Sequence, residues 1–196
     1  GSEEAFVKKM NERAQKLGMK DTHFVNCCGL DADNHYSSAL DIAIMSRELV
    51  TKHPKIYEYS SIWMDTIRDG AFGLTNTNRL VRFYRGCTGL KTGSTSAAGF
   101  CVSATAERNG FSLICVIMGA ESRDVRNAEA TALLDWGFAN YGIYQAPAKE
   151  LEPISVVGGI ESQCPISNGT FSAVLPKGKI ASVEVRLTLP ERIEAP

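Results

Sequence analysis

No serine in this chain is followed by lysine three positions later, and none begins a Ser-x-Asn triplet. These two patterns supply the attacking serine and its neighbouring base in one class of acyl-transfer site. The chain therefore lacks the residues that would attack a carbonyl in such a site, whatever else of the site it carries.

Long apolar runs and a strong net charge are also missing. No run approaches the ~20 apolar residues needed to span a bilayer, so no transmembrane segment is predicted. The opening Gly1-Ser2-Glu3-Glu4 does not have the pattern of a secretory signal peptide, and we interpret it as an internal start or as residues left from an expression tag. The net charge is −1, with acids and bases interspersed, which argues against a nucleic-acid partner.

Cysteine and histidine spacings typical of metal sites are missing as well. The chain has six cysteines and three histidines but no Cys-x-x-Cys pair or zinc-type cluster, so we expect no metal and no cofactor. Cys101 and Cys115 lie in apolar runs, and the adjacent Cys27 and Cys28 are poorly placed to bridge each other. Mostly reduced thiols are expected. For Cys28, a buried and inert thiol is favoured over a reactive one, because no sequence neighbour would depress its pKa.

The three histidines give no clear sign of catalysis. His23, His35 and His53 lie in a turn, in a polar loop and before a proline. A triad of Ser38, His35 and Asp33 would be too local and has no nucleophile elbow. We therefore expect the histidines to be catalytically inert.

What the sequence does contain is the tripeptide Lys91-Thr92-Gly93, at the end of an apparent strand and followed by Ser94-Thr95. It presents a cation and a hydroxyl, followed by a glycine that leaves room for close approach. Lys-Thr-Gly is one of three motifs found together in penicillin-binding proteins and class A β-lactamases. Alone it is weak evidence, since a strand that runs into a turn also explains it.

With its surroundings, the sequence resembles the low-molecular-weight penicillin-binding proteins, the serine-type D-alanyl-D-alanine carboxypeptidases. The resemblance spans roughly residues 1 to 145, and more loosely the rest. Four blocks carry it in the family's order and at about its spacing: residues 18–24, 29–41, 76–100 and 133–138.

The resemblance implies roles for five residues. Lys91 and Ser94 would be catalytic, Lys91 through its positive charge and Ser94 through a backbone N–H in the oxyanion hole. Lys91, Thr92, Gly93, Ser94 and Thr95 would bind substrate. Thr92 would donate a hydrogen bond to the terminal carboxylate, and Gly93 would let the substrate backbone lie along the strand edge.

Each role has a simpler alternative. Lys91 alone would be a solvated lysine at a strand end, and Ser94 and Thr95 would be turn residues that satisfy local backbone groups. Arg79 and Arg82 are most simply surface or sheet-edge charges, although Arg79 has the geometry to bind a carboxylate.

Periodicity and turn signals predict the elements of the first 145 residues. Three helices are expected, at 2–17, 38–52 and 122–141. Five strands are expected, at 61–67, 71–75, 87–92, 99–106 and 111–118. The dipeptides Asp69-Gly70 and Asn109-Gly110 indicate hairpin turns.

The apolar pattern also predicts which faces are buried. The strands at 99–106 and 111–118 are apolar on both faces, which implies a sheet covered by helices on both sides. The inward side chains of the first helix are expected to be Phe6, Met10, Ala14 and Leu17. Those of the last helix are expected to be Val125, Ala128, Ala132, Leu133 and Trp136.

The composition changes near residue 146. Beyond it we see no helical pattern, only β-branched runs at 154–157, 171–175 and 180–189. The predicted fold class is α/β (α+β): a β-lactamase/transpeptidase-like antiparallel sheet covered by helices, plus a small β-rich C-terminal module. Residues 1–145 would be the C-terminal part of the catalytic domain. Residues 146–196 would be a sandwich-like module that is cut short.

By resemblance, we expect part of a carboxypeptidase that removes terminal D-alanine from peptidoglycan stem peptides through an acyl-enzyme. Its partners would be stem peptides ending in D-Ala-D-Ala, β-lactam antibiotics and a second polypeptide carrying the N-terminal half. The location would be extracytoplasmic, at the cell surface or in the periplasm. The chain alone is expected to be inactive because the nucleophile is missing. The alternatives are a non-catalytic fragment or degenerate relative with a structural or binding role, and a β-lactamase.

Overall fold

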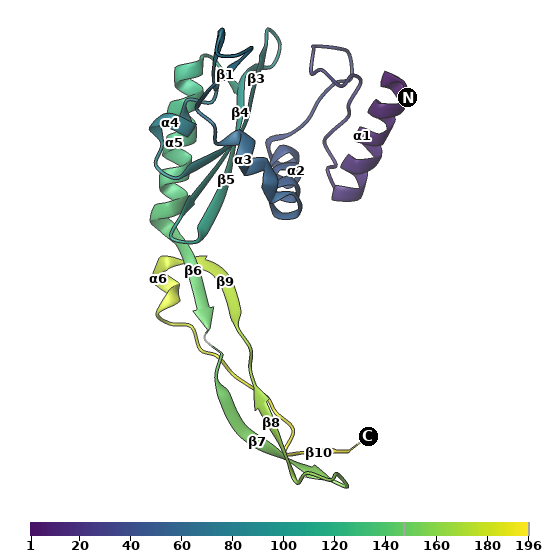
Figure 1. Ribbon diagram of the computed structural model, residues 1–196, viewed down its shortest axis with the longest axis vertical. Helices are drawn as coiled ribbons and strands as arrows, with labels where there is room; N and C mark the ends of the chain where they lie inside the picture. The colour runs from purple at the N-terminus through teal and green to yellow at the C-terminus, as the bar shows by residue number, and fades with distance from the viewer. Residues whose placement is uncertain (147, 196) are drawn as a thin grey trace. The chain divides into compact units, whose positions relative to one another are not determined.

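The computed structural model describes residues 1–146 and 148–195. Its internal contacts divide the chain into two units, Gly1–Phe138 and Ala139–Pro196. The division falls near the end of helix α5 (Arg123–Asn140), earlier than the predicted boundary between residues 145 and 146. The first unit carries most of the helices and the Lys-Thr-Gly tripeptide, and the second is rich in strands (Figure 1).

The centre of the first unit is a three-stranded antiparallel sheet in the order β3-β4-β5. Its strands are β3 (Cys87–Thr95), β4 (Gly99–Arg108) and β5 (Phe111–Ala120). The turn between β4 and β5 has Asn109 and Gly110 at φ +53° and +74°, as the Asn-Gly dipeptide predicts. Because β3 has a strand on one side only, it forms an edge of the sheet.

Helices cover both faces of this sheet, as predicted (Figure 1). On one face lies α2 (Ala39–Lys52), whose buried Ser46 hydroxyl is 2.7 Å from the hydroxyl of Ser103 on β4. On the other face lies α5, where Phe138 packs edge-to-face on Phe111 of β5 with ring centroids 5.8 Å apart. The predicted stop of the second helix before Pro54 is confirmed.

The predicted inward face of α5 is wrong. Val125, Ala128, Ala132, Leu133 and Trp136 are all exposed. The residues that α5 buries are instead Arg126, Ala130, Leu134, Gly137 and Phe138. Apolar residues occur on two sides of this helix, so periodicity alone does not choose between them. Close approach to the sheet selects the side with Gly137, where a Cβ atom would lie 2.6 Å from Leu113 Cδ1.

A polar cluster ties the end of β4 to α5. The Tyr84 hydroxyl donates to Asp135 Oδ1 at 2.7 Å, and Arg108 Nη2 lies 3.4 Å from the same oxygen. The Arg108 guanidinium also sits over the rings of Tyr84 and Phe138, 4.7 and 4.5 Å from their centroids. Burial, and then the hydrogen bond to Asp135, raise the pKa of Tyr84 far above its usual value. The block at residues 133–138 therefore fixes the last helix on the sheet.

Helix α1 (Glu3–Leu17) has the predicted ends: the Ser2 side chain caps it, and Gly18 closes it at φ +78°. Its predicted core stripe is only partly correct. Ala14 is buried, Met10 and Leu17 are half-buried, and Phe6 is 55% exposed. The helix contacts α2 through few residues, including the Arg13–Glu48 ion pair at 2.6 Å, so little of the stripe is covered within the described residues.

Between α2 and β3 the chain forms small elements: a 3₁₀ turn (Pro54–Ile56), α3 (Tyr57–Ser60), strands β1 (Met64–Ile67) and β2 (Phe72–Thr75), and α4 (Leu80–Phe83). The predicted hairpin around Asp69-Gly70 is confirmed by the antiparallel pairing of β1 with β2. The one-turn helices have no periodic pattern long enough to predict.

The second unit contains two small sheets. β6 (Tyr141–Ala146) pairs with β9 (Phe171–Pro176), and β7 (Glu150–Val157) lies between β8 (Gln163–Ser167) and β10 (Arg192–Glu194). The runs at 154–157 and 171–175 are strands, as predicted.

Two expectations for the second unit are wrong. The run at 180–189 is not a strand, and a helical turn, α6 (Lys177–Ile180), occurs where no helix was expected. β-branched residues at 180–189 suit a strand locally, but without a neighbouring strand to pair with they form none. No helix among the described residues is both long enough and apolar enough to span a membrane.

Candidate substrate-binding edge at Lys91-Thr92-Gly93

The Lys-Thr-Gly tripeptide lies on β3, at the edge of the central sheet. Lys91, Thr92 and Gly93 pair with Ser103, Val102 and Cys101 of β4. Strand pleating turns successive side chains to opposite faces, so Lys91 is exposed while Thr92 is only 8% exposed. The tripeptide thus has an exposed cation on one face of the sheet and a buried hydroxyl on the other, along an edge with which no further described strand pairs.

The Thr92 hydroxyl is held by the segment before α4. Its Oγ1 lies 2.6 Å from Thr77 Oγ1. The next residue, Asn78, is 1% exposed: its Nδ2 donates to Gly89 O on β3 at 3.0 Å, and its Oδ1 accepts from Leu80 N at 3.2 Å. Asn78 therefore fastens this segment to the same strand that carries the tripeptide, and places the Thr77 hydroxyl against that of Thr92.

Sequence reasoning missed the roles of Thr77 and Asn78. The residues lie in one of the blocks that carry the family resemblance, which was the available signal. Nothing in their local pattern indicates a contact with residues 11 to 15 positions further on. The contact forms only when the segment before α4 packs against β3, and the sequence around Thr77 and Asn78 does not show that packing.

Lys91 and Gly93 complete the edge. The Lys91 ammonium donates to the Thr92 carbonyl at 2.5 Å, so the Lys91 side chain lies along the strand. A Cβ atom on Gly93 would have no atom within 4 Å, and its φ is not in the left-handed region. Neither packing nor backbone conformation requires glycine here. Its effect is to leave the strand surface open beside Lys91.

Ser94 and Thr95 end β3 at the turn to β4. Ser94 is exposed and lines a shallow hollow of about 620 Å³ formed by residues 94–100 and 119–121. Thr95 Oγ1 donates to Asp31 Oδ1 at 2.5 Å and accepts from Ala98 N at 2.9 Å. All five predicted site residues thus follow one another along one strand edge, and the last of them is tied to a distant loop.

The arginines predicted as surface charges are exposed. Arg79 Nη1 lies 3.6 Å from Asp124 Oδ1, where both side chains are mostly solvated. Arg82 is exposed on α4. In the structure the carboxylate near Arg79 is that of Asp124, in the first turn of α5, which suits the surface-charge interpretation.

His23 and His35 hold the 18–38 loop through backbone contacts. His23 Nδ1 is 2.7 Å from Asn34 O, and the His23 backbone forms a two-way bridge with Tyr36. His35 Nδ1 accepts from Val25 N at 3.1 Å. His53 forms the C-terminal cap of α2. The rings of His23 and His35 thus have partners within the loop, and His53 acts through its backbone N–H.

No two of the six cysteines, all of which lie among the described residues, are joined in a disulfide. The preference for a buried Cys28 is wrong, because Cys27 and Cys28 are both exposed. Cys28 Sγ lies 3.4 Å from Asn26 Oδ1, and Cys27 Sγ lies 3.5 Å from Glu3 Oε1. The loop is anchored through its other side chains, so these two thiols stay at its surface.

The contact with Glu3 affects the reactivity of the Cys27 thiol, and this effect can be measured. Hydrogen bonding to the Glu3 carboxylate is the main cause that raises the pKa of the Cys27 thiol. The thiolate is the reactive form, so Glu3→Ala should increase the alkylation rate of Cys27 at pH 7.5 by about two- to fivefold. Peptide mass spectrometry after timed iodoacetamide treatment measures it. Glu4→Ala, at the same helix terminus, is the control and should leave the rate unchanged; equal rates in all three proteins would contradict the assignment.

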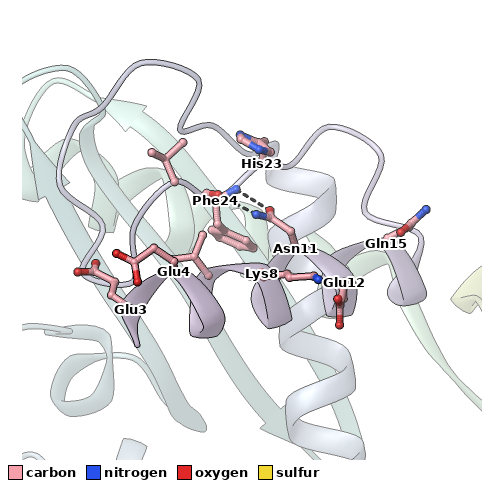
Figure 2. A pocket seen from close by; sticks show the side chains of 10 residues that line it. Glu3, Glu4, Lys8, Asn11, Glu12, Gln15, His23 and Phe24 are labelled. Atoms are coloured by element: carbon pink, nitrogen blue, oxygen red, sulfur yellow. Dashed lines mark hydrogen bonds between the residues drawn. The ribbon is translucent and has the colours of Figure 1, made fainter. Parts of the chain in front are cut away.

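Another hollow, of about 750 Å³, lies between α1 and residues 23–25 (Figure 2). In it the Asn11 side chain donates to Phe24 O and accepts from Phe24 N, both at 2.8 Å. None of the predicted site residues lines this hollow. Within residues 1–146 and 148–195, no group of three or more His, Cys, Asp or Glu side chains is arranged to hold a metal ion.

The curated relatives of this chain are D-alanyl-D-alanine carboxypeptidases. It is 46% identical over 144 residues to carboxypeptidase DacF of Bacillus subtilis, covering 72% of this chain and 37% of that protein. It is 36% identical over 198 residues to carboxypeptidase DacD of Escherichia coli, covering 96% of this chain and 49% of that protein. The chain thus spans about half or less of these relatives.

Solved structures agree. Penicillin-binding protein 5 of Haemophilus influenzae superposes with a TM-score of 0.76 at 32% identity, covering 97% of this chain and 57% of that one. Penicillin-binding protein D2 of Listeria monocytogenes, solved in a cefotaxime-bound form, gives a TM-score of 0.63 at 38% identity, covering 68% of this chain and 55% of that one. The predicted fold class is therefore confirmed.

The sequence model of one protein family, described as D-alanyl-D-alanine carboxypeptidase, matches residues 1–122. That stretch contains the whole Lys91–Thr95 edge and the elements that support it. Together with the relatives, it shows that this chain belongs to the D-alanyl-D-alanine carboxypeptidase family.

Proposed function

We propose that this chain is part of a serine-type carboxypeptidase that removes the terminal D-alanine from peptidoglycan stem peptides, outside the cytoplasm. One observation carries the proposal. The Thr92 hydroxyl, paired with that of Thr77 at 2.6 Å, lies on an open strand edge one residue from the Lys91 ammonium. An exposed cation on a strand edge suits a terminal carboxylate, because charge-assisted hydrogen bonds are the strongest ones to that group.

The edge of β3 has a second function in this proposal. A peptide that lies along the strand would bring its scissile carbonyl near Ser94, whose backbone N–H would stabilise the oxyanion. The bare Gly93 leaves room for that approach. Lys91 would hold the carboxylate and favour the charged form of its neighbours.

The reaction that this edge would support is acyl transfer to a serine. The serine oxygen attacks the peptide carbonyl while its proton passes to a base, and the D-alanine amine then leaves with a proton. Water afterwards hydrolyses the ester and releases the shortened peptide. Within residues 1–196 no serine has the Ser-x-x-Lys spacing, so the attacking serine would come from the part of the relatives that this chain does not match.

β-Lactams are the second class of ligand. Listeria penicillin-binding protein D2, which resembles this chain, was solved in cefotaxime-bound and ampicillin-bound forms. A β-lactam carries a carboxylate and a reactive carbonyl, so the same edge would bind it, and its opened ring would remain as an ester on the serine.

The test is to incubate the native polypeptide that carries this sequence with benzylpenicillin and to measure denatured intact masses. The 196-residue chain is treated in parallel. We expect a stoichiometric penicilloyl adduct on the native polypeptide, none on the chain alone, and release of D-alanine from a peptide ending in D-Ala-D-Ala. A native polypeptide that shows neither adduct nor D-alanine release would contradict the proposal. An adduct on the chain alone would mean that the nucleophile lies within residues 1–196.

A further inference from the structure

Asp31 is joined to the turn that follows the Lys-Thr-Gly strand. Its Oδ1 accepts from Thr95 Oγ1 at 2.5 Å, and its Oδ2 accepts from Ala97 N at 3.3 Å. Thr95 Oγ1 also accepts from Ala98 N at 2.9 Å. One carboxylate, 64 residues earlier in the chain than Thr95, thus holds the last residue of β3 and the middle of the β3–β4 turn.

The backbone around Asp31 is itself fixed. Asn26 closes a tight turn just before it: Asn26 Oδ1 accepts from Gly29 N at 2.8 Å, and Asn26 Nδ2 donates to Leu30 O at 2.9 Å. These bonds hold the backbone of Gly29 and Leu30, the two residues before Asp31. Its carboxylate therefore projects from a constrained turn, although the residue is exposed.

The rest of the 18–38 loop is anchored to helices α1 and α2. Asp41, 2% exposed in the first turn of α2, accepts from Asp21 N at 2.8 Å and from Thr22 Oγ1 at 2.7 Å. Asn11 of α1 holds the Phe24 backbone on both sides (Figure 2). A continuous set of hydrogen bonds thus connects the helices, through the loop, to the end of β3.

We propose that Asp31 is a positioning residue for the oxyanion-binding end of β3. By holding Thr95 and Ala97, it fixes the backbone of Ser94, the adjacent residue, at the register that acyl transfer requires. This inference rests on the proposed function. Oxyanion donors act only within about 2.7–3.1 Å of the developing charge. A displacement of about 1 Å can cost about 100-fold in rate.

A carboxylate is suited to this role. Both of its oxygens accept, so it can bind a hydroxyl and an N–H together. An asparagine has one acceptor oxygen, so Thr95 would have to accept from its NH₂ group instead of donating, and the charge-assisted contact would be lost. The contacts are exposed, and exposed polar contacts contribute little to global stability. Loss of Asp31 should therefore alter the turn and the chemistry far more than the melting temperature.

The test compares Asp31→Asn with the wild type, in the native polypeptide that carries this sequence. Stopped-flow acylation by a fluorescent penicillin gives the acylation rate constant and the dissociation constant of the initial complex separately. We expect the rate constant to fall about 10- to 100-fold while the dissociation constant changes less than about threefold. Asp33→Asn is the matched control, two residues along the same loop, and should behave as the wild type.

A double-mutant cycle separates positioning from general destabilisation. Thr95→Val removes the same contact from the strand side, and Thr95→Ser keeps the hydroxyl and should restore most of the rate. If Asp31 acts through Thr95, Asp31→Asn should have at most a small effect in the Thr95→Val background. Equal effects in both backgrounds would overturn the proposal. If Asp31→Asn does not fold, the acylation rates of Thr95→Val and Thr95→Ser are compared instead. Equal rates in these two variants would overturn the proposal.

The outcomes for this inference and for the proposed function are distinguishable. A wild type that is acylated, with Asp31→Asn acylated equally fast, overturns the role of Asp31 and leaves the proposed function standing. A wild type that is never acylated overturns both the proposed carboxypeptidase function and the role of Asp31 in acylation. Hydrogen exchange at the amides of residues 94–98 reports the anchoring itself: we expect faster exchange in Asp31→Asn, and unchanged exchange overturns the anchoring.

Discussion

Lys91→Ala is expected to lower the second-order rate constant for penicillin acylation of the native polypeptide by about 100- to 1000-fold, the effect of removing one preorganised charge-stabilising group. Lys91 is exposed on the open edge of β3, and its ammonium lies along the strand beside Thr92. Without it, the ligand carboxylate would meet only neutral donors. Labelling with a fluorescent penicillin, quenched at timed intervals and quantified on gels, measures the rate constant.

The control for Lys91 is another exposed cation of the first unit. Arg82→Ala removes such a charge from α4 and should change the acylation rate constant less than about twofold, since isolated surface charges contribute little.

Thr92→Val keeps the shape of the side chain but removes the hydroxyl that pairs with Thr77, and should reduce the acylation rate constant by about tenfold or more. If Lys91→Ala were acylated at the wild-type rate, the anchoring role of the edge would be wrong.

The central sheet could be predicted from the sequence because its signals are local. Asn109-Gly110 needs positive φ at two consecutive residues, and two apolar runs flank it, so the β4–β5 hairpin follows from neighbouring residues alone. The tripeptide itself is readable as a motif. In both cases the residues that allow the prediction are the same residues that form the hairpin or the motif.

Contacts between distant segments could not be predicted in this way. Asn78 lies in a segment with no strand or helix pattern, yet it is 1% exposed and bonded to Gly89 O. Asp31 looks like one more acid in a polar loop until the fold brings it to Thr95. Such pairs depend on how the elements pack, and a hydrogen-bonding side chain gives no sign in sequence of which distant group it will meet.

The wrong predictions have a related cause. Val125 and Trp136 form an apolar stripe as regular as the one that α5 buries, and the choice between the stripes depends on the Gly137 contact with Leu113. A buried Cys28 was expected because no sequence neighbour would depress its pKa, but it lies exposed in a loop whose anchors are Asn11 and Asp41. Predictions of burial from residue type and periodicity fail where contacts with a particular neighbouring segment decide which side chain is buried.

Gly86→Ala is expected to be among the most destabilising single changes in the first unit. Gly86 precedes β3 with φ +83°, and a Cβ atom there would lie 2.3 Å from the backbone oxygen of Glu107. Since Gly86 O also accepts from Glu107 N at 2.8 Å, the two backbones cannot separate without breaking the start of the β3–β4 pairing. Strained φ and a forced backbone shift together cost about 3 kcal/mol.

That cost corresponds to a melting temperature about 6–12 °C lower for a domain of this size. Gly70→Ala separates the two contributions: Gly70 has a similar φ of +88° in the β1–β2 turn, but a Cβ atom there meets nothing within 4 Å. It should cost only about 1 kcal/mol, from the backbone conformation. Thermal unfolding of the native polypeptide, followed by circular dichroism, compares the two variants. Equal shifts would mean that φ alone matters at Gly86. A larger shift for Gly86→Ala would show that close approach of two backbones fixes where the Lys91 strand begins.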